Sequence, residues 1–236
     1  MFSSAPRRVY TYNVFIGSSQ GLEEERRCFC ERLNFFNRVH GADENLAFWP
    51  VRWEDTVTGY GRPQSRINED LDNCLYALFI WHERWGSPAG GAYTSGTEEE
   101  FARAEELKER GILIDIALFF KRIDPAKLVD PGPQLESVRK FREKIAREKK
   151  YMFKDYSSID EFRDYLEMHL ASWQRFHRKN VAFAGGSFAG RPAGFDKRWD
   201  PALGQGKWKR SGPEEQLGMA ILKNPHSAEY ASFIPI

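Results

Sequence analysis

The first three quarters of the chain switch repeatedly between strand-like and helix-like patterns. Residues 9–16 are β-branched and aromatic and then break at Gly17-Ser18-Ser19, which predicts a strand ending in a tight polar loop. From Gly21 to about Val39, apolar residues recur three, four or seven positions apart, as in an amphipathic helix. Strand, loop and helix in this order predict the opening of an α/β unit.

The same alternation continues to about residue 176. It predicts further strands at 46–51, 75–81, 112–120 and 151–153, and helices at 67–74, 97–110, 135–150 and 159–176. The run from Leu75 to Trp81 is nearly all apolar, which is typical of a central parallel strand buried on both faces, whereas Pro50 favours an edge strand. We therefore expect an α/β fold with a parallel sheet of about five strands flanked by helices.

The pattern ends near residue 178. From Val181 onward glycine and proline accumulate and no period is sustained, so we expect an α/β domain over 1–178 and an irregular, Gly-rich extension over 179–236. Five aromatic residues are too many for a plain linker: Phe183, Phe188, Phe195, Trp199 and Trp208. The extension is expected to drape over the domain or to contact a partner.

Composition narrows the classes of partner. Thirty-five basic residues nearly balance 34 acidic ones, and a formal net charge of +1 gives no global attraction to nucleic acid. Cys28, Cys30 and Cys74 are too few and too irregularly spaced for a zinc cluster or a disulfide framework, so no metal is expected. No apolar run reaches the roughly 18 residues of a membrane span, and no signal-peptide pattern opens the chain. A cytoplasmic protein without a membrane anchor is expected.

Four segments at the predicted strand ends gather the candidate chemistry, because ligands of parallel sheets bind beyond the carboxyl ends of the strands. They are 17–19, 53–64, 81–86 and the turn into the helix at residue 97. Their hydroxyls, aromatic rings and arginines are the candidate binding residues: Ser18, Ser19, Trp53, Tyr60, Arg62, Trp81, Arg84 and Trp85. Arginine suits phosphate groups and tryptophan suits a nicotinamide or adenine ring, although Trp81 and Trp85 also suit a core and a cleft wall.

The turn into that helix carries three consecutive carboxylates at Glu98, Glu99 and Glu100. Two capping boxes explain them structurally, Ser95-x-x-Glu98 and Thr97-x-x-Glu100, and the helix dipole favours acidic residues there. Against this interpretation, adjacent carboxylates repel one another, and Glu100 precedes the core-facing Phe101, which places it at a cleft rim where its pKa can be raised. Both interpretations of Glu100 stay open at this point.

Two other features, the turn after the first strand and a histidine at a strand end, give weaker indications of function. The turn at Gly17-Ser18-Ser19 follows a strand, as a phosphate-binding turn would, but it lacks both the GxGxxG and the GxxxxGK[ST] patterns. Neither a dinucleotide-binding Rossmann site nor a P-loop is therefore supported. His82 stands at a strand end without a serine or cysteine arrangement that would complete a triad, so a structural role is expected.

Four ordered segments together resemble a TIR-like family of unknown function, often found at the front of bacterial STAND ATPases and other antiphage proteins. The resemblance covers about residues 9–175. It rests on the segments Val14-Phe15-Ile16-Gly17-Ser18-Ser19, Gly59-Tyr60-Gly61-Arg62-Pro63-Gln64, Arg84-Trp85-Gly86 and Ser95-Gly96-Thr97-Glu98-Glu99-Glu100-Phe101. It implies a flavodoxin-like fold and, in enzymatic members, cleavage of the nicotinamide glycosidic bond of NAD through one glutamate near the start of the third helix.

On this resemblance, Glu100 corresponds to the catalytic glutamate, and the loop over 53–64 to one that shapes the site and mediates assembly. The inserted segment 86–93 and the additional Glu98 and Glu99 depart from the pattern and leave the choice among the three glutamates open. NAD would be a substrate and no cofactor would be required. A homo-oligomer or an effector-sensor pair is the expected assembly. The alternatives are a non-catalytic TIR-like assembly module and a nucleoside deoxyribosyltransferase-like enzyme.

Overall fold

The computed structural model of the chain describes residues 9–57, 59–184, 198–199 and 208–209. Five parallel strands form one sheet in the order β2 (Leu46–Arg52), β1 (Tyr10–Ser18), β3 (Tyr76–Trp81), β4 (Asp115–Lys121) and β5 (Lys154–Tyr156). All six residues of β3, the central strand, are buried, and β2 lies at an edge with Pro50 opposite Val14. The prediction of a flavodoxin-like α/β sheet of five strands is confirmed.

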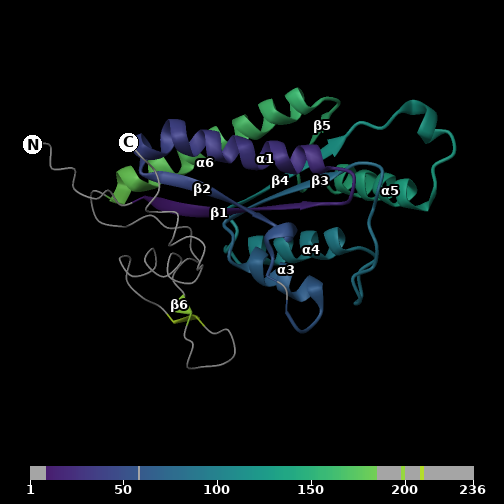
Figure 1. Cartoon of the computed structure of the whole chain (residues 1–236), viewed down its shortest axis with the longest axis horizontal. Coiled ribbons are helices and arrows are strands. Elements are labelled where there is room, and N and C mark those ends of the chain that lie inside the picture. The colour runs from purple at the N-terminus through teal and green to yellow at the C-terminus, as the bar shows by residue number, and fades with distance from the viewer. Residues whose placement is uncertain (1–8, 58, 185–197, 200–207, 210–236) are drawn as a thin grey trace, which may run out of the picture.

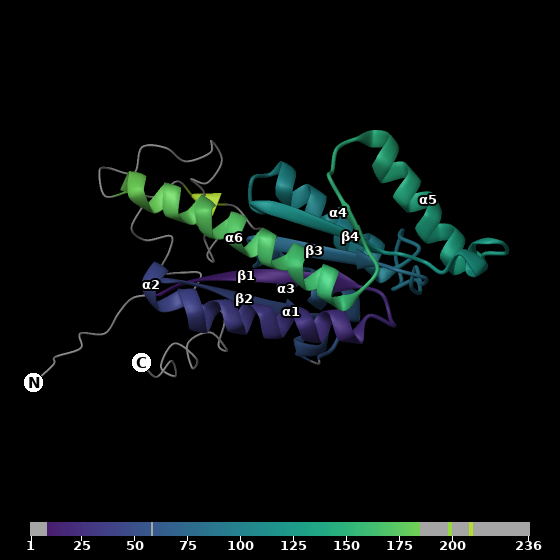
Figure 2. The ribbon, with the colours of Figure 1, turned by 90° about the horizontal axis from the view of Figure 1, so that it is seen from above.

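Two layers of helices enclose the sheet (Figure 1, Figure 2). One face is covered by α1 (Glu23–Phe36) and α6 (Ile159–Ala184), and the other by α3 (Pro63–Asp72), α4 (Gly96–Glu109) and α5 (Pro133–Glu148). The helix over 97–110 was predicted one residue late, and Gly111 follows it with φ +70°, the left-handed conformation that ends many helices.

Successive residues along a strand pack in two different hydrophobic clusters, one on each face of the sheet. In β1, Val14 and Ile16 pack in the cluster under α1 and α6, whereas Phe15 packs in the cluster under α3, α4 and α5. In β3, Leu78 packs in the cluster under α1 and α6, and Trp81 packs in the cluster under α3, α4 and α5. Because side chains alternate across a pleated strand, adjacent residues at a strand end also face different helix layers.

Several elements differ from the sequence prediction. Helix α3 begins at Pro63, four residues before the predicted start, and β4 begins at Asp115, three residues after it. The last strand begins at Lys154, not at Tyr151, because Tyr151 and Phe153 pack against the α4 and α5 core while Met152 is exposed. Helix α6 continues to Ala184, so the proposed boundary near residue 178 lies inside a helix. Most of the predicted extension over 179–236, including Phe188 and Phe195, lies outside the described residues. Its described parts are the end of α6 and a short antiparallel pair, β6 (Arg198–Trp199) with β7 (Trp208–Lys209).

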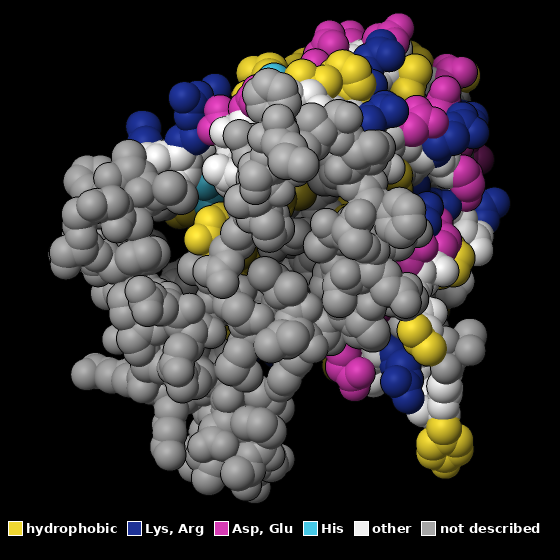
Figure 3. Space-filling view, turned by 60° about the vertical axis from the view of Figure 1, so that its left-hand side comes forward, with side chains coloured by type: hydrophobic (Ala, Val, Ile, Leu, Met, Phe, Trp, Pro, Cys, Tyr) yellow, Lys and Arg dark blue, Asp and Glu magenta, His cyan; other side chains and the backbone are white. Residues whose placement is uncertain are grey.

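The remaining described elements are short turns of helix: a π-helical turn at Asn37–Gly41, α2 at Ala42–Glu44, and 3-10 turns at Trp53–Asp55 and Pro125–Leu128. Basic and acidic side chains are interspersed over the described surface in Figure 3, in keeping with a net charge of +1. Within the described part of the chain, no helix has both the length and the apolar character required to cross a bilayer.

Candidate functional site

The acidic triplet Glu98, Glu99 and Glu100 lies at the start of α4, with Glu98 and Glu99 in the first turn and Glu100 beside the end of β1. This is the carboxyl edge of the sheet, where α/β folds bind ligands. The three glutamates face different partners, so each is described separately.

Glu98 lies in the capped first turn of α4. Ser95 is the N-cap residue, and its Oγ accepts a hydrogen bond from the Glu98 amide at 3.1 Å. The Glu98 carboxylate in turn accepts hydrogen bonds from the amide and the hydroxyl of Thr94, both at 2.7 Å. Of the two expected capping boxes, the structure contains the Ser95 half of the first, because the Glu98 carboxylate binds Thr94 and not the Ser95 amide. The Glu98 carboxylate therefore has a structural role, because it binds the turn that precedes α4.

Glu99 forms an ion pair with Arg62. Arg62 Nη1 donates to Oε1 at 2.8 Å, and Nη2 donates to Oε2. Asn68 Nδ2 donates to Oε1 at 2.9 Å. The hydrogen bonds from Arg62 are the largest cause that lowers the pKa of Glu99 below its ordinary value. Arg62 Nε also donates to the carbonyl of Ala89 at 2.7 Å. One guanidinium thus joins the loop before α3 to the loop before α4 and to α4 itself.

Glu100 is buried, with 6% of its surface exposed, and it has no cation as partner among the contacts described. Gln64 Nε2 donates to Oε1 at 2.9 Å. The other oxygen, Oε2, lies against Gly17 at the end of β1, where a Cβ would stand 2.9 Å from it and 2.5 Å from the Phe79 ring. Glycine at position 17 is therefore what leaves room for the carboxylate.

Burial raises the pKa of Glu100 to about 8, because the charged form loses its hydration. The hydrogen bond from Gln64 opposes this rise and the charge of Glu99 adds to it. Glu100 is thus a buried carboxyl group that titrates near neutral pH at a ligand-binding edge of the sheet. This combination is typical of catalytic acids and bases.

Ser18 and Ser19 lie near Arg26 of α1. Ser18 Oγ accepts from Arg26 Nη1 at 2.9 Å, and Arg26 Nε lies 2.6 Å from Glu54 in an ion pair. The Ser19 hydroxyl is buried and has no hydrogen-bond partner among the described residues. Because Ser18 follows Gly17 in the strand, it faces the α1 layer while Gly17 faces Glu100. The structure therefore does not bring Ser18 and Glu100 to the same face of the sheet.

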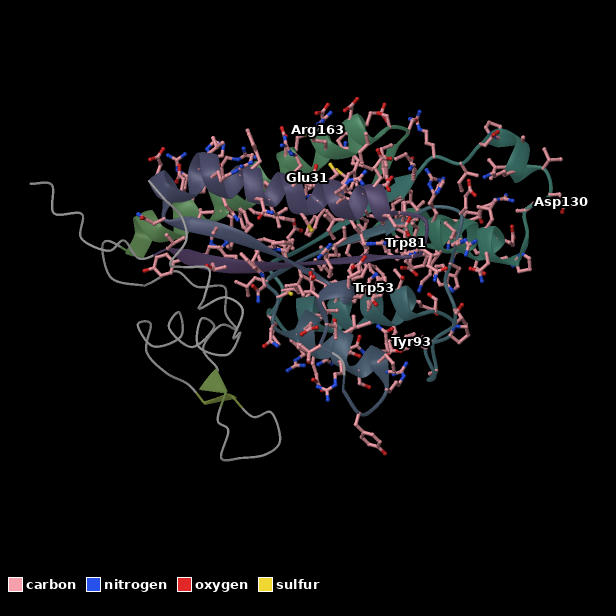
Figure 4. All side chains as sticks on the ribbon, viewed as in Figure 1. Glu31, Trp53, Trp81, Tyr93, Asp130 and Arg163 are labelled. Atoms are coloured by element: carbon pink, nitrogen blue, oxygen red, sulfur yellow. The ribbon has the colours of Figure 1, made fainter. Side chains whose placement is uncertain are left out.

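The aromatic candidates fall into two groups. Trp81 is fully buried among Phe79, Phe120 and other rings of the core, with its Nε1 unpaired among the described residues, and Trp85 is 7% exposed. Trp53 and Tyr60 are 46% and 101% exposed, and the Arg26 guanidinium lies 6.0 Å from the Trp53 ring centroid. In Figure 4, Trp81 lies within the layers, whereas Tyr93 lies on the side formed by α3 and α4.

Trp85 supports the loop before α4, whereas Arg84 contacts the loop after β1. Trp85 Nε1 donates to Thr94 Oγ1 at 2.7 Å, and the same hydroxyl donates to Glu98. The backbone amide of Trp85 donates to Gln134 of α5 at 2.9 Å. Arg84 Nη1 donates to Gln20 at 3.2 Å at an exposed position. The Trp85 ring thus fixes the turn that carries Glu98 and does not reach Glu100.

A comparison with protein families matches residues 13–171 to a domain of unknown function, DUF4062. The chain belongs to the DUF4062 family. The match covers all five strands of the sheet from Asn13 onward and the first half of α6. No curated protein matches the chain.

Gln64 and Gly17 define the Glu100 environment in this DUF4062 domain, and both lie in the expected strand-end segments, but the sequence assigned neither of them to Glu100. Gln64 is the second residue of α3 and is 5% exposed. Its polar side chain follows Pro63 at a helix start, a position that is ordinarily solvated, so nothing local indicated its burial. The contact with Glu100 arises from the packing of α3 on α4, between residues 36 positions apart.

Two further sites in the DUF4062 domain are separate from Glu100. His82 Nε2 lies 3.5 Å from Glu83 Oε1, and burial lowers the pKa of His82. At the amino edge of the sheet, a pocket of about 240 Å³ is lined by Tyr10, Tyr12, Glu44, Asn45, Leu46, His177 and Arg178. Among the described residues, no group of three or more His, Cys, Asp or Glu side chains is placed to hold a metal ion.

Proposed function

We propose that this DUF4062 domain is a TIR-like, NAD-cleaving effector in which Glu100 is the catalytic carboxylate. The single observation that carries the proposal is the division of the acidic triplet: Glu98 and Glu99 have strong structural partners, whereas Glu100 is buried beside a neutral amide. A buried carboxyl group without a cation weakens a fold, so a function is the natural reason to keep it.

The proposed reaction breaks the bond between ribose C1′ and the nicotinamide nitrogen of NAD. The bonding electron pair leaves with the ring and neutralises its positive charge, so no acid is required for the leaving group. An ionised Glu100 stabilises the oxocarbenium-like carbon, and water then adds to C1′ and loses a proton. Attack by a group of the same nucleotide in place of water would give a cyclic product.

We propose that the enclosed state of Glu100 keeps this activity low until the site opens. At neutral pH a carboxyl group with a pKa near 8 is mostly protonated and cannot stabilise a cation. Moving the Arg62 and Ala89 loops apart would hydrate Glu100, lower its pKa and admit NAD. We propose that self-association through the loop over 53–64 causes this opening, in keeping with a role in bacterial antiphage immunity.

The direct test is to incubate the purified chain with NAD over a range of protein concentrations and to measure free nicotinamide by chromatography. Glu98→Gln is the matched control for Glu100→Gln, because it removes one charge from the same helix turn and the Glu98 carboxylate contacts Thr94. Glu100→Gln is expected to lower nicotinamide release at least a hundredfold, and Glu98→Gln far less. Equal activity of wild type and Glu100→Gln would reject the catalytic assignment, and no release at any concentration would reject NAD cleavage.

A second candidate function is a non-catalytic assembly module. It is favoured by three apolar side chains on the loop over 53–64: Trp53, Val57 and Tyr60 are 46%, 65% and 101% exposed. Replacing Val57 and Tyr60 by serine is expected to lower self-association, measured by sedimentation. If self-association occurs without nicotinamide release, the module is the better description. Release of a free base from 2′-deoxynucleosides would instead favour the deoxyribosyltransferase-like alternative.

A further inference from the structure

Gln64 is the only described side chain that donates a hydrogen bond to Glu100, and it belongs to a different helix. Its Nε2 lies 2.9 Å from Glu100 Oε1, while Glu100 Oε2 lies against Gly17. Both carboxylate oxygens therefore have a fixed neighbour, one from α3 and one from β1. The plane of the carboxyl group is set by these two neighbours together.

Gly96, the first residue of α4, makes this arrangement possible. A Cβ on Gly96 would stand 2.6 Å from Gln64 Oε1 and 3.4 Å from Gln64 Cδ. The backbone of Gly96 does not have the positive φ that favours glycine, which five other glycines of the described chain do have. The requirement for glycine at position 96 is therefore spatial: it lets the Gln64 amide lie against the start of α4.

We infer that Gln64 is a positioning residue, whose amide holds the Glu100 carboxylate in one orientation at the end of β1 and whose own position depends on Gly96. The inference rests on the proposed function where it treats Glu100 as the reacting carboxylate. The geometry of the Gln64, Glu100 and Gly96 contact stands independently of the reaction.

An amide suits this role chemically. It donates a hydrogen bond without adding charge, so it orients the carboxylate and leaves its negative charge available to a positive centre. An arginine or lysine at position 64 would neutralise that charge. The charged group that acts on Glu100 within the described chain is Glu99 of the same helix, and Glu99 is itself paired with Arg62.

Loss of the Gln64 hydrogen bond is expected to change the pKa of Glu100 in a definite direction. The bond favours the ionised form of Glu100, so removing it is expected to raise the pH at which Glu100 titrates, by about one unit. At a pH below that midpoint, each unit of upward shift lowers the ionised fraction of Glu100 in the enclosed state about tenfold.

Two substitutions separate positioning from packing. Gln64→Met removes the donor and nearly keeps the side-chain volume, whereas Gly96→Ala keeps Gln64 and displaces it. The titration of Glu100 is followed by carboxyl ¹³C NMR, with the signal assigned from its absence in Glu100→Gln. Both single variants are expected to move the midpoint upward, and Gly96→Ala is expected to add nothing in the Gln64→Met background.

An unchanged midpoint in Gln64→Met would overturn the inference, and so would shifts that add in the double variant. Thermal melting checks that each variant is folded, and if Gln64→Met fails to fold, Gly96→Ala alone decides. If the wild type releases no nicotinamide but the midpoint shifts, the positioning role holds and the proposed function fails. If nicotinamide is released but the midpoint stays, the function holds and the positioning role fails.

Discussion

Glu25 and Glu100 are both buried carboxyl groups at the carboxyl edge of the sheet, but they lie on opposite faces and have different partners. Glu25, 1% exposed, accepts from Lys121 Nζ at 2.7 Å and from the Tyr156 hydroxyl at 3.1 Å. Glu100, 6% exposed, accepts from the amide of Gln64. The first carboxylate is neutralised by a cation, and the second is not. Similar burial therefore gives a structural ion pair on one face and a titratable group on the other.

Among the substitutions that test this comparison, Glu100→Gln is expected to have the largest effect. The quantity to measure is the free energy of unfolding as a function of pH. The pKa of Glu100 is raised from 4.5 to about 8, so between these values the folded protein keeps a proton that the unfolded chain has lost. The contribution of Glu100 to the free energy of unfolding is greatest below about pH 4.5. It falls as the pH rises to about 8, by about 5 kcal/mol at most. Glu100→Gln should remove this fall in urea denaturation at pH 5 and pH 9.

The matched control is Glu31→Gln, at an exposed position of α1. It removes a carboxylate from the surface and should leave the pH dependence of the wild type in place. A Glu100→Gln protein that loses as much stability between pH 5 and pH 9 as the wild type would show that Glu100 is ionised in the folded state, and the comparison with Glu25 would then fail.

A smaller effect is expected from Lys121→Met, which removes the cation from Glu25. It leaves a buried carboxylate with one neutral donor, much as Glu100 is, and should cost about 2–4 kcal/mol at pH 7 in urea denaturation. Lys127→Met is the control, because Lys127 pairs with Glu83 at a more exposed site and should cost under about 1 kcal/mol. Equal costs for the two lysines would show that the Glu25 pair is not a structural requirement.

The smallest effect is expected from Tyr156→Phe, which removes the neutral donor of Glu25 and keeps the ring. A cost of about 1 kcal/mol follows from one lost hydrogen bond to a carboxylate that still has Lys121. Chemical denaturation measures it, alone and with Lys121→Met. In that background the cost should be larger, because Tyr156 is then the last described donor to Glu25. A strictly additive pair would contradict this coupling.

The fold was largely predictable from the sequence, because alternating periods and apolar runs identify strands and helices directly. Leu75 to Trp81 was expected at the centre of the sheet and lies there. The prediction was wrong by three residues at the last strand, where Tyr151 and Phe153 are apolar because they pack on neighbouring helices. Apolar character alone does not distinguish a strand from a buried connection.

The candidate site was predictable only in its local part. The cap formed by Ser95 and Glu98 spans three positions and could be recognised from spacing. The partners of Glu99 and Glu100 are Arg62 and Gln64, which are 37 and 36 positions away and meet them through helix packing. Such contacts depend on the tertiary arrangement of α3 and α4, and no local pattern encodes it.

Arg62 has a consequence for the motions of the protein. Its guanidinium connects the loop before α3, the carbonyl of Ala89 and Glu99 of α4, so neither loop can leave its place without breaking contacts shared with the other. In native-state hydrogen exchange the two loops should therefore open as one cooperative unit with a single opening free energy. In Arg62→Met they should exchange as two independent segments, each faster than in the wild type.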